Sequence, residues 1–133
     1  MPHFIVEYTA NLEAEGDLPG LLHKIHEAMI AQDGVFPIGG IRSRAIRLDC
    51  YRMADGAADY AFVHATLKIG AGRDEATKKR AGDALFDVMK AHFAALYERR
   101  YLALSMEIAE FSEAGTWKHN NVHPRFKGSG PRG

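Results

Sequence analysis

The sequence predicts an α/β (α+β) fold, β-α-β-β-α-β, in which a four-stranded mixed sheet carries two helices on one face. Two observations support this prediction. Stretches rich in strand-forming residues alternate with stretches whose apolar residues recur at helical spacing. The order of elements in residues 2–52 is then repeated in residues 59–109. Because the crossover around each helix is short, the two strands within each half should pair in parallel.

The chain of 133 residues fits one compact domain, which we place at residues 1–127, with a C-terminal arm over 110–127 and a flexible tail over 128–133. Lys plus Arg and Asp plus Glu each total 17, so the net charge favours neither nucleic acid nor a membrane as partner. No apolar run approaches membrane-spanning length. The single cysteine, Cys50, suits a reducing compartment, so we expect a cytoplasmic protein with this thiol at least half-buried.

The first half opens with a predicted strand over residues 2–8, followed by a polar bend and an amphipathic helix. Asp17 is a suitable N-cap for that helix, and Pro19 suits its first turn. Gly34 and Pro37 end it. Its apolar residues recur every three or four positions: Leu18, Leu21, Leu22, Ile25, Met29 and Ile30.

The remaining elements complete the repeat. An alternating strand is predicted over residues 41–52 and another strand over 59–69. A sharp glycine-rich turn then leads into a long helix over 74–100, and a last strand covers 102–108. Two helices on one face leave the other face of the sheet bare. We expect that face to be apolar and to be buried by subunit association.

Pro2, directly after Met1, is the most informative residue for function. Removal of Met1 would leave a secondary amine at the start of the chain. Burial beside cations would lower the pKa of this amine toward neutrality, where it can remove and return a proton within one catalytic cycle. The alternative is that Pro2 only begins a strand, where its missing N–H costs nothing.

Arg73 and Arg42 are candidate anion-binding residues. Arg73 directly precedes the second predicted helix, where free backbone N–H groups and the helix dipole favour an anion. An arginine can also bind a carboxylate through two hydrogen bonds. Arg42 begins a strand next to two glycines, where the backbone can approach a ligand closely. Each also has a structural alternative, because Arg73 can pair with Asp74 or Glu75, and any strand can carry an exposed arginine.

Three other motifs are weaker. The turn at 70–72 resembles a phosphate-binding loop, but neither the Lys-Ser/Thr of a P-loop nor a third Rossmann glycine follows it. His119 and His123 have the spacing of zinc ligands on a helix, but Pro124 disfavours a helix there. His64 is expected to be a hydrogen-bonded core histidine. We therefore expect no metal site and no nucleotide site.

Seven segments in chain order resemble the tautomerase superfamily, which includes 4-oxalocrotonate tautomerase and macrophage migration inhibitory factor. They are most similar to its 5-carboxymethyl-2-hydroxymuconate Δ-isomerase family. The segments are PHFIVE (2–7), DLPGL (17–21), GIRSR (40–44), MADG (53–56), DYAFVH (59–64), LKIGAGR (67–73) and NNVH (120–123). A lone N-terminal proline would be a weak signal, whereas this ordered set covers nearly the whole chain and is specific.

The resemblance implies a homotrimer with pockets near the subunit boundaries. It implies an isomerase that converts 5-carboxymethyl-2-hydroxymuconate, an unsaturated tricarboxylate, to its conjugated 2-keto isomer in the breakdown of aromatic compounds. Pro2 would be the catalytic base, and Arg42 and Arg73 would bind the substrate and stabilise charge. The backbone N–H of Ile69 is a further candidate contact. No metal or organic cofactor is expected, since a single base can move the proton.

Two other functions remain open at this point. One is a different proline-dependent tautomerase or hydratase that acts on another unsaturated oxo acid. The other is a non-catalytic binding module on the same fold. The presence of Pro2, Arg42 and Arg73 together favours catalysis, because a signalling surface needs none of them inside a pocket.

Overall fold

The computed structural model describes residues 1–126, so the domain end predicted at residue 127 and the tail over 128–133 lie outside the described residues. The first half contains β1 (His3–Thr9), α1 (Leu18–Ile30) and β2 (Arg42–Leu48). The second half contains β3 (Tyr60–Gly70), α2 (Glu75–His92), α3 (Ala94–Arg99) and β4 (Tyr101–Phe111).

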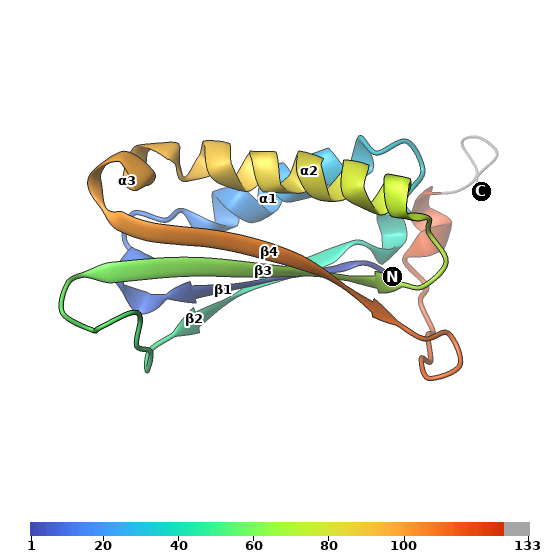
Figure 1. The fold of residues 1–133 in the computed structure, drawn as a ribbon. Coiled ribbons are helices and arrows are strands. Elements are labelled where there is room, and N and C mark those ends of the chain that lie inside the picture. Colours follow the sequence, from blue (N-terminus) through green and yellow to red (C-terminus); the bar gives the residue numbers. More distant parts are fainter. Residues whose placement is uncertain (127–133) are drawn as a thin grey trace.

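The strands form one sheet in the order β2-β1-β3-β4, and Figure 1 shows α1 and α2 together over one face of it. Strands β1 and β2 are parallel, and so are β3 and β4. The two halves meet where β1 and β3 pair in antiparallel register. The predicted repeat of β-α-β units, the mixed sheet and the two-layer arrangement are confirmed.

Helix α1 begins as its sequence predicts. The carboxylate of Asp17 accepts a hydrogen bond from the backbone N–H of Gly20 at 3.2 Å, and Pro19 occupies the first turn. The residues at helical spacing that face the sheet, Leu18, Leu21, Ile25 and Met29, are buried. Within residues 1–126, no helix has both the length and the apolar character needed to cross a membrane.

The helix predicted over 74–100 is divided in two. At Phe93 the backbone leaves helical geometry, with φ −97° and ψ 9°, and α3 then leads back toward β4 (Figure 1). The Phe93 ring is fully buried, and Nε2 of the preceding His92 donates a hydrogen bond to the carbonyl of Gly16 at 2.8 Å. Tertiary packing at these two residues therefore overrides a continuous helical pattern.

Both outer strands differ in length from the prediction. Strand β2 ends at Leu48, because its partner β1 ends at Thr9, which pairs with Leu48, and nothing continues the ladder. Residues 49–52 therefore lie outside the sheet. The expectation of a half-buried Cys50 is wrong, since this residue is exposed. Strand β4 instead continues to Phe111, where it pairs with Gly70 of the long strand β3.

The sheet face away from the helices is mixed, which corrects the expectation of an apolar face. Paired residues of neighbouring strands point to the same side, and His3 pairs with both Arg42 and Lys68. Four residues further along β1, and therefore on the same face, Glu7 lies between Ile46 and His64. The open face is therefore basic near the start of β1 and carries charged and apolar residues beyond.

His64 lies on this open face and not in the core. Its Nδ1 is 2.7 Å from Oγ of Ser105, and its Nε2 is 3.1 Å from the Glu107 carboxylate. The predicted hydrogen bonding is confirmed, but the predicted core position is wrong. The alternation of side chains along β3 explains the difference, because Val63 and Ala65 on either side of His64 are the residues buried beneath the helices.

Candidate active site

The start of β1 is enclosed by the start of β2. Pro2 is buried, and its carbonyl accepts a hydrogen bond from the backbone N–H of Arg42 at 3.1 Å. Gly40, in the short 3₁₀ turn Ile38–Gly40, packs directly on this segment, since a Cβ there would lie 3.4 Å from Cα of Met1 and 3.6 Å from Cδ of Pro2. The two glycines before Arg42 thus allow the close backbone approach that the sequence suggested.

The amino group of Met1 shows the electrostatic character of this end of the chain. Burial lowers the pKa of this amine below its usual value, and the positive charges of Lys118, Arg73 and Arg42 lower it further. Glu113 opposes them with the weakest effect. Pro2, whose nitrogen would become the terminal amine after removal of Met1, is the next residue of the chain and is itself buried. These surroundings favour a neutral amine, the form that can act as a base.

Arg42 faces a cavity of about 530 Å³ that lies against Met1. The cavity is bounded by the starts of β1 and β2, by the end of β3 and by the C-terminal arm, which among the described residues is 112–126. Four cationic side chains line it and no carboxylate does: Arg42, Arg44, Lys68 and Lys118. A cavity with this lining attracts anions.

The arginine and lysine side chains from the sheet are not neutralised by acidic neighbours. Within the part of the chain that the structure describes, Arg42, Arg44 and Lys68 form no ion pair with a carboxylate. Arg44 instead donates to Nδ1 of His3 at 3.1 Å. Burial lowers the pKa of His3, and the charges of Arg44 and Arg42 lower it further, so His3 is held in the neutral form that accepts this bond.

Arg73 contributes its charge from a different position. Its guanidinium donates to the carbonyl of Val35 at 2.8 Å and to that of Gly70 at 3.2 Å, and it lies over the Phe36 ring with 5.4 Å to the centroid. It pairs with neither of the following acidic residues. At the helix N-terminus beside Arg73, the Asp74 carboxylate accepts the N–H of Thr77 at 2.8 Å, so one of the backbone N–H groups there already has an acidic partner.

Ile69 lies beside Pro2 in the sheet. The antiparallel register of β1 and β3 pairs His3 with Lys68, and the next residue of β3 after Lys68 is Ile69. Ile69 is 2% exposed and its side chain belongs to the core, so the side chain is not available to a ligand. The structure therefore brings Pro2, Arg42 and Ile69 together, with Arg73 near enough for its charge to act on the terminal amine.

The C-terminal arm supplies the part of the site that sequence reasoning did not identify. Figure 1 shows the chain's N-terminus at the same end of the sheet as this arm. Trp117, Lys118 and His119 line the cavity of about 530 Å³. The side chain of Asn120 fastens the arm by donating to the carbonyl of Gly39 at 3.0 Å. The similarity of NNVH to the superfamily pattern was a signal that the arm matters, but no spacing in the sequence indicated Lys118.

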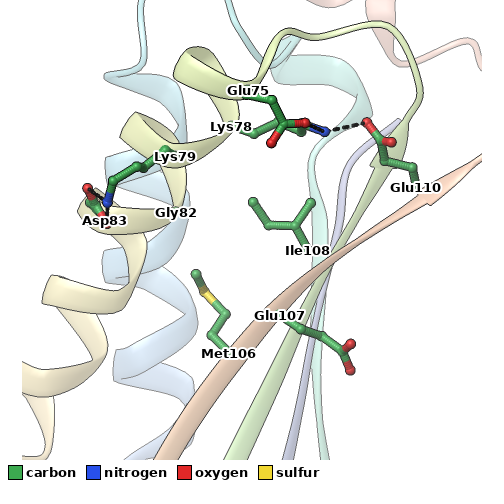
Figure 2. Close-up of a pocket in the computed structure, with 9 residues that line it drawn as sticks. All are labelled: Glu75, Lys78, Lys79, Gly82, Asp83, Met106, Glu107, Ile108 and Glu110. Atoms are coloured by element: carbon green, nitrogen blue, oxygen red, sulfur yellow. Dashed lines mark hydrogen bonds and ion pairs between the residues drawn. The ribbon is translucent and has the colours of Figure 1, made fainter.

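Another hollow, of about 490 Å³, lies between α2 and β4 (Figure 2). Its four carboxylates outnumber its two lysines, and both lysines are already paired. Lys78 lies 2.8 Å from Glu75 and 3.4 Å from Glu110, while Lys79 lies 3.1 Å from Asp83. A negatively charged substrate is disfavoured in such a hollow, so the cation-lined cavity at the N-terminus is the candidate active site.

Comparison with known proteins adds an independent finding. The family model described as 5-carboxymethyl-2-hydroxymuconate isomerase matches residues 2–126. A 5-carboxymethyl-2-hydroxymuconate Delta-isomerase of Escherichia coli is 54% identical over 127 residues, which cover 96% of this chain and 100% of that protein.

Solved structures agree with this match. A 5-carboxymethyl-2-hydroxymuconate isomerase from Deinococcus radiodurans R1 is 53% identical with a TM-score of 0.91, covering 96% of this chain and 95% of that chain. A second structure, of a 5-carboxymethyl-2-hydroxymuconate delta-isomerase, is 31% identical with a TM-score of 0.89, covering 96% and 94%. A fused 4-OT is 14% identical with a TM-score of 0.62, covering 88% and 93%, and supports the fold alone.

Proposed function

Because this chain belongs to the 5-carboxymethyl-2-hydroxymuconate isomerase family and is an isomerase, we propose that Pro2 carries its catalytic proton transfer. The substrate would be 5-carboxymethyl-2-hydroxymuconate, and the product 5-oxopent-3-ene-1,2,5-tricarboxylate. The observation that carries the proposal is the N-terminal cavity, which combines four cationic side chains with the start of the chain, where burial and neighbouring charges lower the pKa of the Met1 amino group.

The proposed reaction moves one proton and leaves the atom count unchanged. The neutral Pro2 amine takes the proton of the 2-hydroxyl group, and the oxygen becomes the carbonyl of a 2-keto acid. The electrons of the diene shift, so that a single double bond remains, between C3 and C4 in conjugation with that carbonyl. The protonated amine then delivers its proton to C5. One group therefore acts as base and then as acid, which requires a pKa near neutrality.

Arg42 and Arg73 have different proposed roles. Arg42 lines the cavity beside the terminal amine, which suits it to bind a carboxylate and to stabilise negative charge as it develops on the 2-oxygen. Arg73 is held by two backbone carbonyls, and we assign it to substrate binding and to lowering the pKa of the amine. The backbone N–H of Ile69 is a further proposed contact. The mechanism uses residues of this chain for every proton movement and includes no metal or organic cofactor.

A homotrimer is also part of the proposal. Strands β2 and β4 are at the two edges of the described sheet, and unpaired strand edges are open to association with another chain. Trp117, which lines the mouth of the cavity, is largely exposed in a single subunit. A neighbouring subunit that covers it would place the site near a subunit boundary. We also propose a cytoplasmic location, which rests on the single cysteine and the reducing compartment that it suits.

The terminal amine can be tested directly. Mass spectrometry of the intact protein should show that Met1 is absent, and inserting one alanine before Pro2 should abolish turnover of 5-carboxymethyl-2-hydroxymuconate. The melting temperature should stay nearly unchanged, because the inserted residue extends the chain at its end. Pro2→Ala should keep part of the activity, since a primary amine remains at the terminus. Full activity in a form that retains Met1 would contradict the mechanism.

A further inference from the structure

Lys118 is the cation of the candidate site that comes from the C-terminal arm. It lines the same cavity as Met1 and Arg42, although more than half of the chain separates it from both in the sequence. The arm that carries it is fastened two residues later, where Asn120 donates to the carbonyl of Gly39. The docked arm therefore closes one side of the cavity with a positive charge.

The ion pair of Lys118 can be exchanged for one with a substrate carboxylate. Its Nζ lies 3.5 Å from a carboxylate oxygen of Glu113, and the two side chains are 38% and 65% exposed. An exposed ion pair of this kind contributes little to stability, because water screens both charges. A carboxylate of the substrate can therefore take the place of Glu113 at little cost.

Lys118 also lies on the reacting side of the cavity. Both Lys118 and Met1 line the cavity, and after burial the charge of Lys118 has the largest effect on the pKa of the Met1 amino group, ahead of Arg73 and Arg42. In the proposed reaction the Pro2 amine, which follows Met1 and becomes terminal once Met1 is removed, must reach C5 of the substrate to deliver its proton. C5 is the atom that bears the carboxymethyl group, so the carboxylate of that group lies only two bonds from the carbon that the amine protonates.

We propose that Lys118 binds the carboxymethyl carboxylate of the substrate and makes the site selective for tricarboxylates over the corresponding dicarboxylates. This inference rests on the proposed function, because it assigns one of the substrate's three carboxylates to a residue of the same site. Arg42 would then bind the carboxylate next to the 2-oxygen. Glu113 pairs with Lys118 and so holds its side chain beside the cavity.

The test compares 5-carboxymethyl-2-hydroxymuconate with 2-hydroxymuconate, which lacks only the carboxymethyl group. Lys118→Met keeps the length of the side chain and removes its charge. It should lower kcat/KM for the tricarboxylate about 10- to 100-fold more than for the dicarboxylate, as expected for the loss of a charged hydrogen bond, and the loss that both substrates share reports the change in the pKa of the amine. Lys118→Arg should restore most of the preference, and Glu113→Gln should lower KM for the tricarboxylate a few-fold by freeing Lys118.

The matched control is Lys90→Met, because Lys90 is also an exposed lysine paired with a carboxylate, Asp87 at 3.7 Å, but lies on α2. It should change neither substrate's constants. Equal losses on both substrates in Lys118→Met would overturn the inference. If Lys118→Met fails to fold, Glu113→Gln decides, and an unchanged KM for the tricarboxylate would count against Lys118.

A binding measurement separates this inference from the proposed function. Calorimetry with propane-1,2,3-tricarboxylate and pentanedioate needs no turnover. The wild-type protein should bind the tricarboxylate more tightly, and Lys118→Met should remove that difference. If the wild-type protein converts neither muconate, the proposed function fails, yet a Lys118-dependent preference in calorimetry would still support the inference. A preference that Lys118→Met leaves intact would refute it.

Discussion

Arg42 and Arg73 are held by different contacts, and this difference determines what their removal should do. Arg42 makes one long side-chain contact, a hydrogen bond from Nε to the carbonyl of Gly40 at 3.4 Å, and otherwise faces the cavity. Arg73 donates hydrogen bonds to two backbone carbonyls and packs on Phe36, so its side chain contributes to the stability of the fold as well as to the charge of the site. For a variant at Arg73, both the free energy of unfolding and the kinetic constants must therefore be measured.

We predict that Arg42→Ala mainly lowers kcat, by about 10- to 10³-fold, because an interaction that grows with developing charge acts on the transition state. Arg73→Ala should mainly raise KM, over a similar range. It should also lower the free energy of unfolding by about 1–3 kcal/mol, since two carbonyls lose their donor. Steady-state kinetics and thermal unfolding measure both effects.

Arg80→Ala is the control for these variants, because Arg80 is an exposed arginine on α2. Its kinetic constants should match those of the wild-type protein. Unchanged constants in both Arg42→Ala and Arg73→Ala would remove the two arginines from the site. Reversed effects on kcat and KM would exchange their proposed roles.

At the scale of secondary-structure elements, the contact that matters most for the site joins the C-terminal arm to the 3₁₀ turn Ile38–Gly40. Gly39 is buried in this contact, and a Cβ on it would lie 2.8 Å from the backbone Cα of His123. The backbone of the arm leaves no room for any side chain larger than hydrogen. The arm, and with it Lys118, is therefore positioned by a glycine that the neighbouring element supplies.

Gly39→Ala should displace the arm and lower the free energy of unfolding by about 1–3 kcal/mol, as for other overpacked sites. Proteolysis after residue 112 should become faster, and KM for the tricarboxylate should rise. Gly82→Ala in α2 is the matched control, because its Cβ would meet only Ile108 and Met106, at 3.5 and 3.7 Å. It should stabilise the protein by up to about 1 kcal/mol, since alanine favours a helix over glycine. Equal protease resistance of the two variants would show that the arm does not depend on this contact.

At the scale of the whole molecule, the helices cover one face of the sheet and leave the other open in a single subunit (Figure 1). That open face carries Glu7 and His64 beside Ile46, so an interface there must pair charges as well as bury apolar groups. Mixed character of this kind is common where proteins associate. The two unpaired strand edges lie at the borders of the same face.

We predict that light scattering at micromolar concentration gives about three times the subunit mass of 14.7 kDa. Ile46→Asp should shift the population toward monomer, because it would bury a charge at the interface. Ile30→Asp should not, although Ile30 and Ile46 are similarly exposed at 46% and 43%, because Ile30 ends α1 in the helical layer. A wild-type protein that is a stable and active monomer would contradict the trimer.

The order and type of the elements could be predicted because local interactions determine them. The Asp17 cap, the spacing of apolar residues in α1 and the alternation in β3 each act over a few residues, and each was found as predicted. The parallel pairing of the first two strands was also predicted, and in the structure this pairing brings Pro2 and Arg42 together. The resemblance to the superfamily supplied their proposed roles.

Only the tertiary structure decided features that depend on residues far apart in the chain. The burial of Phe93 interrupts the second helix, and it depends on packing that no local pattern records. Lys118 joins the site because the C-terminal arm docks on Gly39. The hydrogen bond between Asn120 and Gly39 brings together residues that are 81 positions apart in the sequence. The sequence determined which residues can bind an anion, and the fold determined which of them meet at the amine, because electrostatic interactions act through space and not along the chain.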